Sequence, residues 1–374
     1  MNETPKTVDQ AQNPFVYYHS MREQHPVFYV PEQEAWLVFR YADAERVLTD
    51  YQTFSSRTHC CAYTSAFHSF YRMDPPELQR SRGLVSQPFT PLSVERLADH
   101  ITRLTTELLD RVADRGQMDV IADLAFPLPL RIMADLLGLP TQDYDRYAVW
   151  SQAITGDDPL PELSQYFLEL LTERRDALRP GIVSSLCEAR LDGRSLTEAE
   201  LLGFCRLLFT GANAEMTPFL GNVVQGLIEH PDVADTLRAE PQLMAGAIEE
   251  LLRYYPPVPV SGPRSATVDV ELGGERIRQG QRVVAVLSSV NRDEAVFDDP
   301  DRFDIQRKPN PHLSFITGPH VCIGAHLSRL ETRIVLTALL DRFQDIQLAP
   351  GATLSSAGLF GIKHLPIVFR AFDA

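Results

Sequence analysis

Apolar residues recur every three or four positions through most of the chain, which is the spacing of amphipathic α-helices. Alternation of apolar and polar residues is confined to short segments, and a Gly273-Gly274 pair inside one of them is typical of a hairpin turn. The pattern predicts helices near residues 97–112, 201–227, 241–255 and 325–340, and strands near 35–40, 267–277, 283–287 and 365–369. We therefore expect a mainly α-helical fold with small β-sheets.

Length and charge bear on the number of domains and on the classes of partner. The 374 residues contain no obvious linker or repeat, so we expect one domain spanning residues 1–374. A net charge of −15 disfavours nucleic acid and anionic membranes as partners over most of the surface, although it allows a local basic patch for a redox partner. The start of the chain shows no signal peptide, no stretch predicts a membrane-spanning helix, and five cysteines suit a reducing compartment, so we expect a cytoplasmic protein.

An irregular loop at residues 315–324 ends where helical periodicity begins, and it contains Cys322. Unpaired amides and the helix dipole at a helix N-terminus lower the pKa of a thiol, and a thiolate is the form that ligates metals. Gly318 and Gly324 allow the backbone to turn closely around the sulfur. Cys322 is therefore a candidate metal ligand, and the alternative is a cysteine packed as a small apolar residue.

This loop resembles the heme-binding loop of the cytochrome P450 superfamily, which runs Phe, Gly, any, Gly, any, His or Arg, any, Cys, any, Gly. The matching residues are Phe315, Gly318, His320, Cys322 and Gly324. The first glycine of the pattern is replaced by Ile316. The resemblance implies heme b with Cys322 as its axial thiolate, held in the cytochrome P450 fold between the helix at 201–227 and the helix after Cys322.

Two upstream segments extend the resemblance from about residue 13 to the C-terminus. Glu250 and Arg253 lie three apart in a predicted helix and match the Glu-x-x-Arg motif of the family, although the same spacing also occurs in surface ion pairs. Residues 291–315 follow the family's meander almost residue by residue.

Heme carries two propionates, which need cations or hydrogen-bond donors around them when they are buried. The resemblance assigns this role to Arg82, Arg264 and His320, with His312 as a further candidate. The segment 74–82 resembles the family's Asp-Pro-Pro-Glu-His-x-x-x-Arg, but Leu78 stands in place of the histidine. One propionate contact should therefore be missing or come from another group.

The central helix departs most from the family, whose pattern Ala-Gly-x-(Asp or Glu)-Thr-Thr supplies an acid and an alcohol that deliver protons for dioxygen cleavage. Alignment on Gly211 places Asn213 and Ala214 at these positions, whereas alignment on Gly221 places Ala214 and Glu215 there. Neither alignment supplies the threonine. The one-residue difference between them predicts a bulge in the helix.

Three interpretations of proton delivery follow. The hydroxyl of the substrate and an ordered water could serve, Glu215 could replace the missing acid, or the reaction could be peroxide-driven or an oxidative coupling that needs no efficient dioxygen cleavage. We expect Glu215 to face the heme pocket, and the alternative is that it faces solvent.

The resemblance also implies the residues around the substrate. They are Tyr63, Phe67, Phe70, Val258, Val260, Ser261, Leu359 and Phe360. The residues between Trp150 and Leu163 are few and rich in glycine, proline and aspartate, so we expect a shortened F–G region over an open pocket. Such a pocket suits a bulky polyketide, macrocycle or peptide, free or bound to a carrier protein.

The favoured function is a heme-thiolate monooxygenase that takes electrons from a ferredoxin and ferredoxin reductase or a similar donor, since no flavin or iron-sulfur motif is fused to the chain. The alternative is a heme protein that inserts no oxygen and catalyses oxidative coupling or only binds a ligand.

Overall fold

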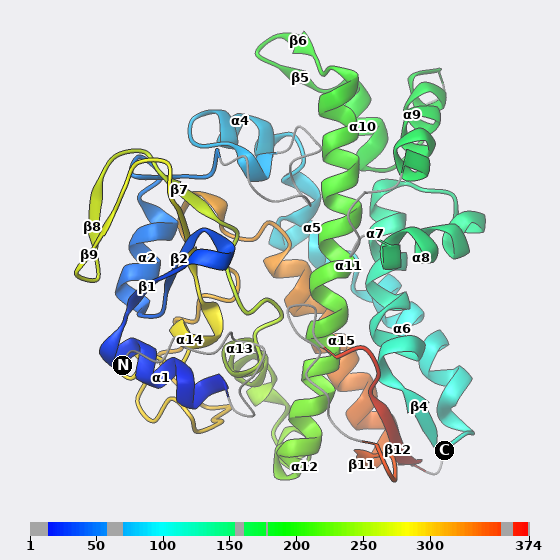
Figure 1. Ribbon diagram of the computed structural model, residues 1–374. Helices are drawn as coiled ribbons and strands as arrows, with labels where there is room; N and C mark the ends of the chain where they lie inside the picture. Colours follow the sequence, from blue (N-terminus) through cyan, green and yellow to red (C-terminus); the bar gives the residue numbers. More distant parts are fainter. Residues whose placement is uncertain (1–13, 58–69, 154–160, 177–178, 353–361, 373–374) are drawn as a thin grey trace.

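One helix of 32 residues, α11 (Glu198–Glu229), runs through the centre of the molecule and organises the elements around it (Figure 1). Its sequence is apolar on most of its circumference, which is typical of a helix that is buried rather than lying on a surface. A capping box begins it, in which the Thr197 hydroxyl accepts from the Glu200 amide and the Glu200 carboxylate accepts from the Thr197 amide. The helix therefore extends a few residues beyond each end of the predicted range 201–227.

The structure is a computed structural model that describes residues 14–57, 70–153, 161–176, 179–352 and 362–372. Within this part of the chain the helices are α1 (Pro14–Gln24), α2 (Tyr41–Thr49), α4 (Glu77–Gly83), α5 (Pro91–Glu95), α6 (Ala98–Ala113), α7 (Pro127–Leu137), α8 (Tyr144–Ala153), α9 (Pro161–Asp176), α10 (Ile182–Glu188), α11, α12 (Pro231–Ala239), α13 (Met244–Tyr254), α14 (Leu287–Val290) and α15 (Ala325–Arg342). The strands are β1 (Val27–Val30), β2 (Ala35–Val38), β3 (Phe54–Ser55), β4 (Gln117–Asp119), β5 (Arg190–Leu191), β6 (Arg194–Ser195), β7 (Arg264–Ala266), β8 (Val270–Leu272), β9 (Glu275–Ile277), β10 (Arg282–Ala285), β11 (Phe343–Leu348) and β12 (Pro366–Ala371).

The β-structure is small, as the alternation predicts. A five-stranded sheet in the order β1-β2-β10-β7-β3 lies on one side of α11 together with α1 and α2 (Figure 1). A three-stranded sheet, β11-β12-β4, joins the end of α15 to the C-terminal segment. The predicted Gly-Gly hairpin is the antiparallel pair β8–β9. The mainly helical fold class is thus confirmed.

The prediction of a bulge in the central helix is wrong. α11 is α-helical over its whole length, although Pro218 lies inside it and leaves the carbonyl of Ala214 without the usual amide donor. The π-helical turn in the described part of the chain is found elsewhere, at Ile121–Ala125, and this segment packs against α11. The one-residue difference between the two alignments therefore has no counterpart in the backbone of α11.

The predicted shortening of the F–G region stays a prediction. α8 continues to Ala153 and α9 begins at Pro161, while residues 154–160 lie outside the described part of the chain. Asn213 on α11 holds α8 in place, because its side-chain amide donates to the Ser151 hydroxyl at 2.6 Å.

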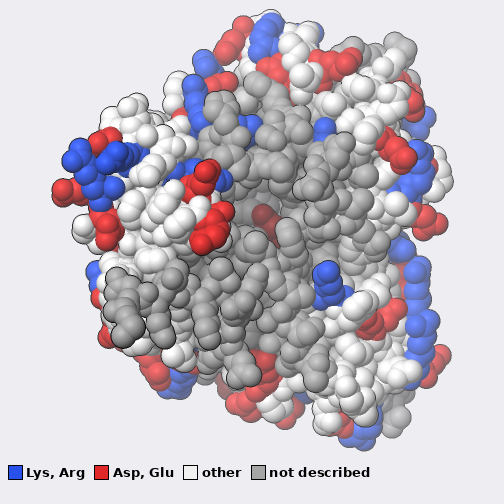
Figure 2. Space-filling model, viewed as in Figure 1, with Lys and Arg blue, Asp and Glu red and all other residues white. Residues whose placement is uncertain are grey.

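On the face seen in Figure 2, the acidic and basic side chains of the described residues are interspersed and lie mainly around the edge. Of the helices that the structure describes, none combines the length and the apolar character that crossing a membrane requires.

Glu200→Gln is expected to lower the free energy of unfolding at neutral pH by about 1–2 kcal/mol. The hydrogen bonds from Arg194 and then from Thr197 outweigh the effect of burial and lower the pKa of Glu200 to about 2. An unfolded glutamate titrates near a pKa of about 4.3, so this stabilisation is present above that value and is lost as the pH falls through about 2. Urea unfolding of the wild-type and Glu200→Gln proteins at about pH 7 and about pH 3 measures this stabilisation.

The exposed first-turn residue Glu198 provides the matched control, since Glu198→Gln should change stability little at either pH. An equal deficit of the Glu200→Gln protein at both pH values would contradict the assignment.

Candidate functional site

Cys322 lies in a tight loop between a short 3₁₀ turn (Gly318–His320) and the start of α15. Its amide donates to the Phe315 carbonyl at 3.0 Å, which closes the loop. Gly318 has φ +74, and a Cβ at this position would lie 2.7 Å from the Leu48 carbonyl oxygen, so a larger residue does not fit. The close turn around the sulfur is therefore enforced by the neighbouring helix α2.

Ile316 adopts a left-handed backbone with φ +50, which explains why the family has glycine at this position. A β-branched residue is strained there, and the surrounding apolar packing of Ile316 holds it in place. The departure from the family pattern therefore changes the residue without changing the path of the loop.

The expected lowering of the Cys322 pKa is wrong for the free thiol. Burial, and then the Glu215 carboxylate, raise the pKa of the Cys322 thiol to about 12, and the Gly324 amide and nearby arginines oppose them only in part. The effect of the helix dipole is outweighed because Cys322 lies three residues before α15 in a mostly apolar pocket. Metal binding at this sulfur would therefore release a proton.

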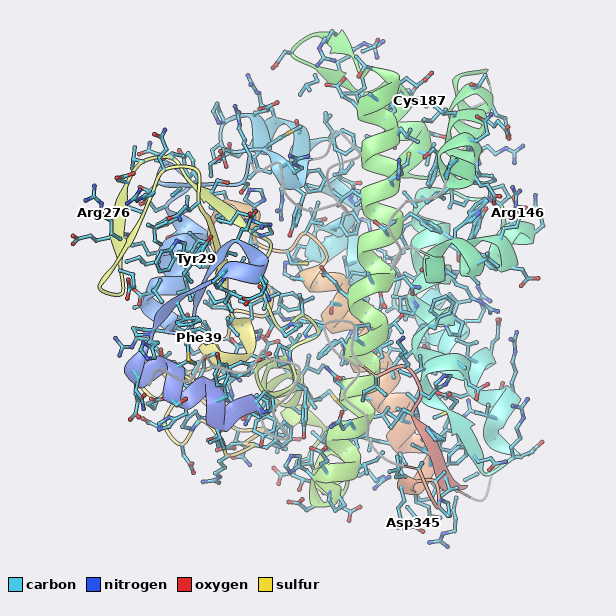
Figure 3. The ribbon with its side chains drawn as sticks, in the orientation of Figure 1. Tyr29, Phe39, Arg146, Cys187, Arg276 and Asp345 are labelled. Atoms are coloured by element: carbon cyan, nitrogen blue, oxygen red, sulfur yellow. The ribbon has the colours of Figure 1, made fainter. Side chains whose placement is uncertain are left out.

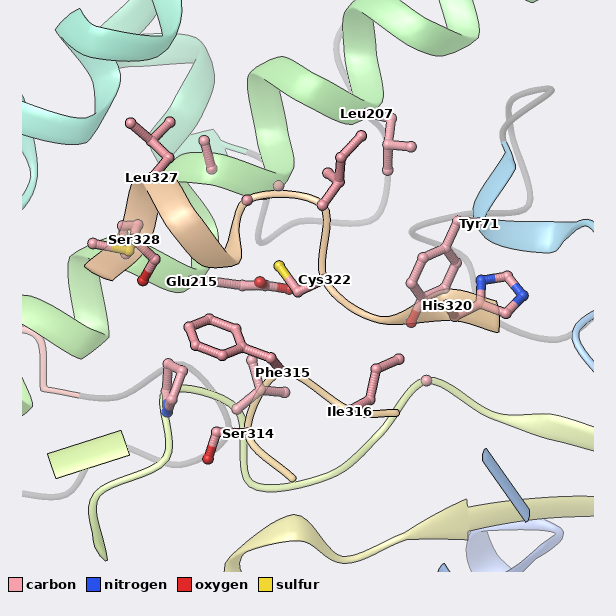
Figure 4. A pocket seen from close by; sticks show the side chains of 18 of the residues that line it. Tyr71, Leu207, Glu215, Ser314, Phe315, Ile316, His320, Cys322, Leu327 and Ser328 are labelled. Carbon is pink, nitrogen blue, oxygen red and sulfur yellow. The ribbon is translucent and has the colours of Figure 1, made fainter. Parts of the chain in front are cut away.

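A large pocket opens on the sulfur of Cys322 between α11 and the loop (Figure 4). Its lining is mostly apolar and comes from α4, α7, α11, the chain before β7, the cysteine loop and α15. The lining residues are Phe70, Tyr71, Arg82, Phe89, Met133, Leu207, Leu208, Gly211, Ala212, Glu215, Met216, Pro257, Val258, Val260, Ser261, Gly262, Leu287, Ser314, Phe315, Ile316, His320, Cys322, Ile323, Gly324, Leu327, Ser328 and Glu331. A flat apolar cofactor with a metal at its centre fits such a lining, with the thiol on one face and α11 on the other.

On the α11 side, Glu215 borders the pocket and points towards Cys322 (Figure 4). Its surface is exposed within the pocket, but the protein that surrounds the pocket desolvates the carboxyl and raises its pKa to about 7. Gly211 also lines the pocket, whereas Asn213 and Ala214 do not. Asn213 is buried against α8 because its side chain bonds Ser151 and Thr217, so its predicted catalytic placement is corrected.

A second carboxyl, that of Glu331 on α15, also borders the pocket. The residue is 2 % exposed, and its Oε2 has no hydrogen-bond partner among the described residues. Burial raises the pKa of Glu331 to about 8. The sequence pattern gave Glu331 no functional role, because its burial depends on the packing of α15 against distant helices.

Behind the loop, Glu250 and Arg253 on α13 form a fully buried ion pair with two hydrogen bonds of 2.7 Å. Arg253 also donates to the carbonyls of Asn291, Pro300 and Arg302, and Glu250 accepts from Asp304, Arg307 and Asn310. The pair therefore ties α13 to residues 291–310 and is not a surface ion pair.

His312 belongs to this supporting network and does not line the pocket. Its Nε2 lies 3.2 Å from a carboxylate oxygen of Glu249, which also binds Arg329. Burial alone would raise the pKa of Glu249, but the hydrogen bonds from Arg329 and His312 lower it to about 2. Of the predicted propionate residues, His312 is thus placed elsewhere, since its ring is bound to α13.

Arg82 lines the pocket, and Arg264 donates to the carbonyl of the lining residue Gly262, so these two arginines show whether a dianionic cofactor fits. Arg264 is only 3 % exposed, and its Nη1 donates to the carbonyls of Gly262 and Pro263. Burial lowers the pKa of Arg264, and burial also lowers the pKa of Arg82, which lines the pocket. Among the described residues, neither guanidinium forms an ion pair with a carboxylate. Two carboxylates of a bound group would neutralise both charges, so these residues fit the propionates of heme.

The two other positions considered for the propionates differ, because only one of them carries a polar side chain. His320 lines the pocket, and its Nε2 lies 2.9 Å from the Met73 carbonyl and 2.8 Å from the Ser56 hydroxyl. Burial, and then the charge of Arg264, lowers the pKa of His320 to about 4. Leu78 is fully buried and contributes no donor.

The predicted substrate residues Phe70, Val258, Val260 and Ser261 line the pocket. The predicted residues Tyr63, Phe67, Leu359 and Phe360 lie outside the described part of the chain. Tyr71 also lines the pocket but was not predicted, although it stands next to Phe70 and could have been found by extending that segment. Met133 on α7 was also not predicted, because no motif in the neighbouring sequence indicates that it lines the pocket.

The comparisons with known proteins agree with this geometry. The family model described as Cytochrome P450 matches residues 160–353. The cyclomarin C epoxidase CymV of Salinispora arenicola is 38% identical over 95% of this chain and 95% of its own. The crystal structure of HmtN, a post-tailoring hydroxylase in himastatin biosynthesis, superposes with a TM-score of 0.87 at 35% identity, over 94% of this chain and 96% of its own. P450BioI, crystallised with a fatty-acyl-ligated acyl carrier protein, gives a TM-score of 0.87 at 32% identity, over 96% and 99%.

The thiol at the pocket, the buried Glu250–Arg253 pair and the position of Arg82 and Arg264 therefore agree with the sequence relationship. The chain belongs to the cytochrome P450 family and is a monooxygenase whose cofactor is heme.

Proposed function

We propose that this enzyme inserts an oxygen atom into a bulky, mainly apolar secondary metabolite, such as a polyketide, macrocycle or peptide. The observation that supports this most is the pocket itself, which extends from Cys322 past α11 to α7 and has a mostly apolar lining with few polar groups. Electrons would come from a ferredoxin-type donor, since the chain carries no motif for a second redox group.

Relatives support the substrate class. CymV acts on cyclomarin C and HmtN is a tailoring hydroxylase, so both act on elaborated natural products. The P450BioI complex shows that a related protein receives its substrate on an acyl carrier protein. Delivery on a carrier is therefore a second part of the proposal for this chain.

When bound, heme would supply the activation of dioxygen. Cys322 would hold the iron, and Arg82 and Arg264 would balance the propionates. Glu215 stands on the α11 side and would hold the proton that the family's acid and alcohol normally deliver. Gly211 and Ala212 leave space beside it for substrate or water, because neither carries a large side chain.

The proposal is tested with purified holoenzyme, a ferredoxin and ferredoxin reductase pair, and a panel of macrolides, cyclic peptides and carrier-bound acyl chains. A substrate is recognised by its shift of the heme spin state. With that compound we expect consumption of dioxygen and reductant, and a product that contains one atom from isotopically labelled dioxygen. A coupled or dehydrogenated product without the label would contradict oxygen insertion and favour the alternative reaction.

A further inference from the structure

The family's histidine donor to a heme propionate is absent here, because Leu78 occupies its position and is fully buried on α4. A buried carboxylate that loses a donor is destabilised, so another group is expected to compensate. The compensating group must carry an O–H or N–H, line the pocket and lie at the end where Arg82 and His320 are found.

Tyr71 meets these conditions. It follows Phe70 in a short helical turn (Phe70–Arg72) just before α4, and it lines the pocket. Its ring centroid lies 6.4 Å from that of His320, and the two rings stand side by side at one end of the pocket in Figure 4. Tyr71 also lies close enough to Arg264 for the two to interact electrostatically.

Gly262 fixes the position of the Tyr71 hydroxyl. A Cβ on Gly262 would lie 1.8 Å from the Tyr71 Oη and 2.7 Å from its Cζ, so the phenol packs directly on the glycine backbone. The carbonyl of the same glycine accepts a hydrogen bond from Arg264. Gly262 thus brings the phenol and the buried guanidinium together at the edge of the pocket.

The polar groups beside Tyr71 leave room for a further hydrogen-bond donor at this end of the pocket. The Met73 carbonyl can only accept, so the Nε2 of His320 donates its proton there and not into the pocket. Arg264 does not itself line the pocket, whereas Tyr71 and Gly262, whose carbonyl accepts from Arg264, both do. Arg82 is the remaining pocket-lining cation of the predicted set.

We propose that the Tyr71 hydroxyl donates a hydrogen bond to a heme propionate and takes the place of the histidine that is missing at Leu78. The phenol would supply a neutral donor at the pocket lining, close to the charge of the buried Arg264. Gly262 is required in this arrangement because any side chain there would displace the phenol.

The test compares heme retention in Tyr71→Phe and wild-type holoenzyme, with excess apomyoglobin as the heme acceptor. A hydrogen bond to a charged group predicts heme loss faster by on the order of tenfold in Tyr71→Phe. Resonance Raman spectra should show a shifted propionate bending mode in this variant, and also in Gly262→Ala, which keeps the hydroxyl but displaces it. Tyr29→Phe, on strand β1 away from the pocket (Figure 3), is the matched control and should match wild type in both measurements.

Reconstitution with heme dimethyl ester separates the hydrogen bond from packing. The esterified propionates carry no charge and accept only a weaker hydrogen bond, so the difference in loss rate between wild-type and Tyr71→Phe proteins should shrink for this heme. The proposal is overturned if Tyr71→Phe loses natural heme at the wild-type rate with an unshifted mode, or if it loses both hemes faster by the same factor. Neither readout depends on turnover, so a wrong substrate class would not affect them.

Discussion

Glu250→Gln is expected to lower the free energy of unfolding by about 3–5 kcal/mol and to yield protein that holds little heme. The variant removes the negative charge that faces Arg253 and Arg307, and Arg253 is fully buried. An unpaired buried guanidinium is costly, and the loss is a large fraction of the roughly 5–15 kcal/mol that stabilises a typical protein. Thermal denaturation followed by circular dichroism, with heme content per chain, measures the effect.

The control for this prediction is an ion pair of similar geometry on the surface. Glu107→Gln breaks the exposed Arg103–Glu107 pair on α6 and should cost less than about 1 kcal/mol. Equal stability losses for the two variants would show that Glu250 contributes no more than a surface carboxylate, which contradicts its role in fixing residues 291–310 behind the heme loop.

Glu215→Gln is expected to lower the rate of product formation by about 10²–10⁴-fold while the enzyme still consumes reductant. Glutamine has nearly the same shape as glutamate, so it keeps the lining of the pocket but cannot give up a proton from a carboxyl group. Reductant would then be used without matching product. The measurement is the ratio of product formed to reductant and dioxygen consumed, in wild type and variant.

Glu198→Gln, at the exposed start of the same helix, is the matched control and should leave this ratio unchanged. If Glu215→Gln turns over at the wild-type rate with full coupling, the proton comes from another source. The pocket offers one in Glu331, and the hydroxyl of the substrate is another.

The sequence predicted the elements whose signals are local. The 3.6-residue periodicity located α11 and α15, and the Gly273-Gly274 pair located the β8–β9 hairpin. The Cys322 loop was recognisable from its glycines. Gly318 is needed there because it packs too closely against α2 for any side chain to fit. Such features depend on neighbours in the chain, so a single sequence is enough to find them.

Features that depend on distant packing could not be predicted. The choice between Asn213 and Glu215 depends on which face of α11 meets α8, and the sequence alone left both alignments open. The expected effect of the helix dipole on Cys322 failed because burial of the sulfur, which many elements produce together, dominates the pKa. The placement of His312 failed for the same reason, since its partner Glu249 lies on another helix.

The most direct test of the central claim is the carbon monoxide difference spectrum of the reduced protein, recorded for wild type and for single cysteine variants. We expect the thiolate-type absorption band that gives the family its name in wild type, and its loss in Cys322→Ala. Cys187→Ala and Cys205→Ala should retain it, because Cys187 lies by α10 (Figure 3) and neither cysteine lines the pocket. A thiolate-type band that persists in Cys322→Ala, or that is absent from heme-loaded wild type, would contradict the account.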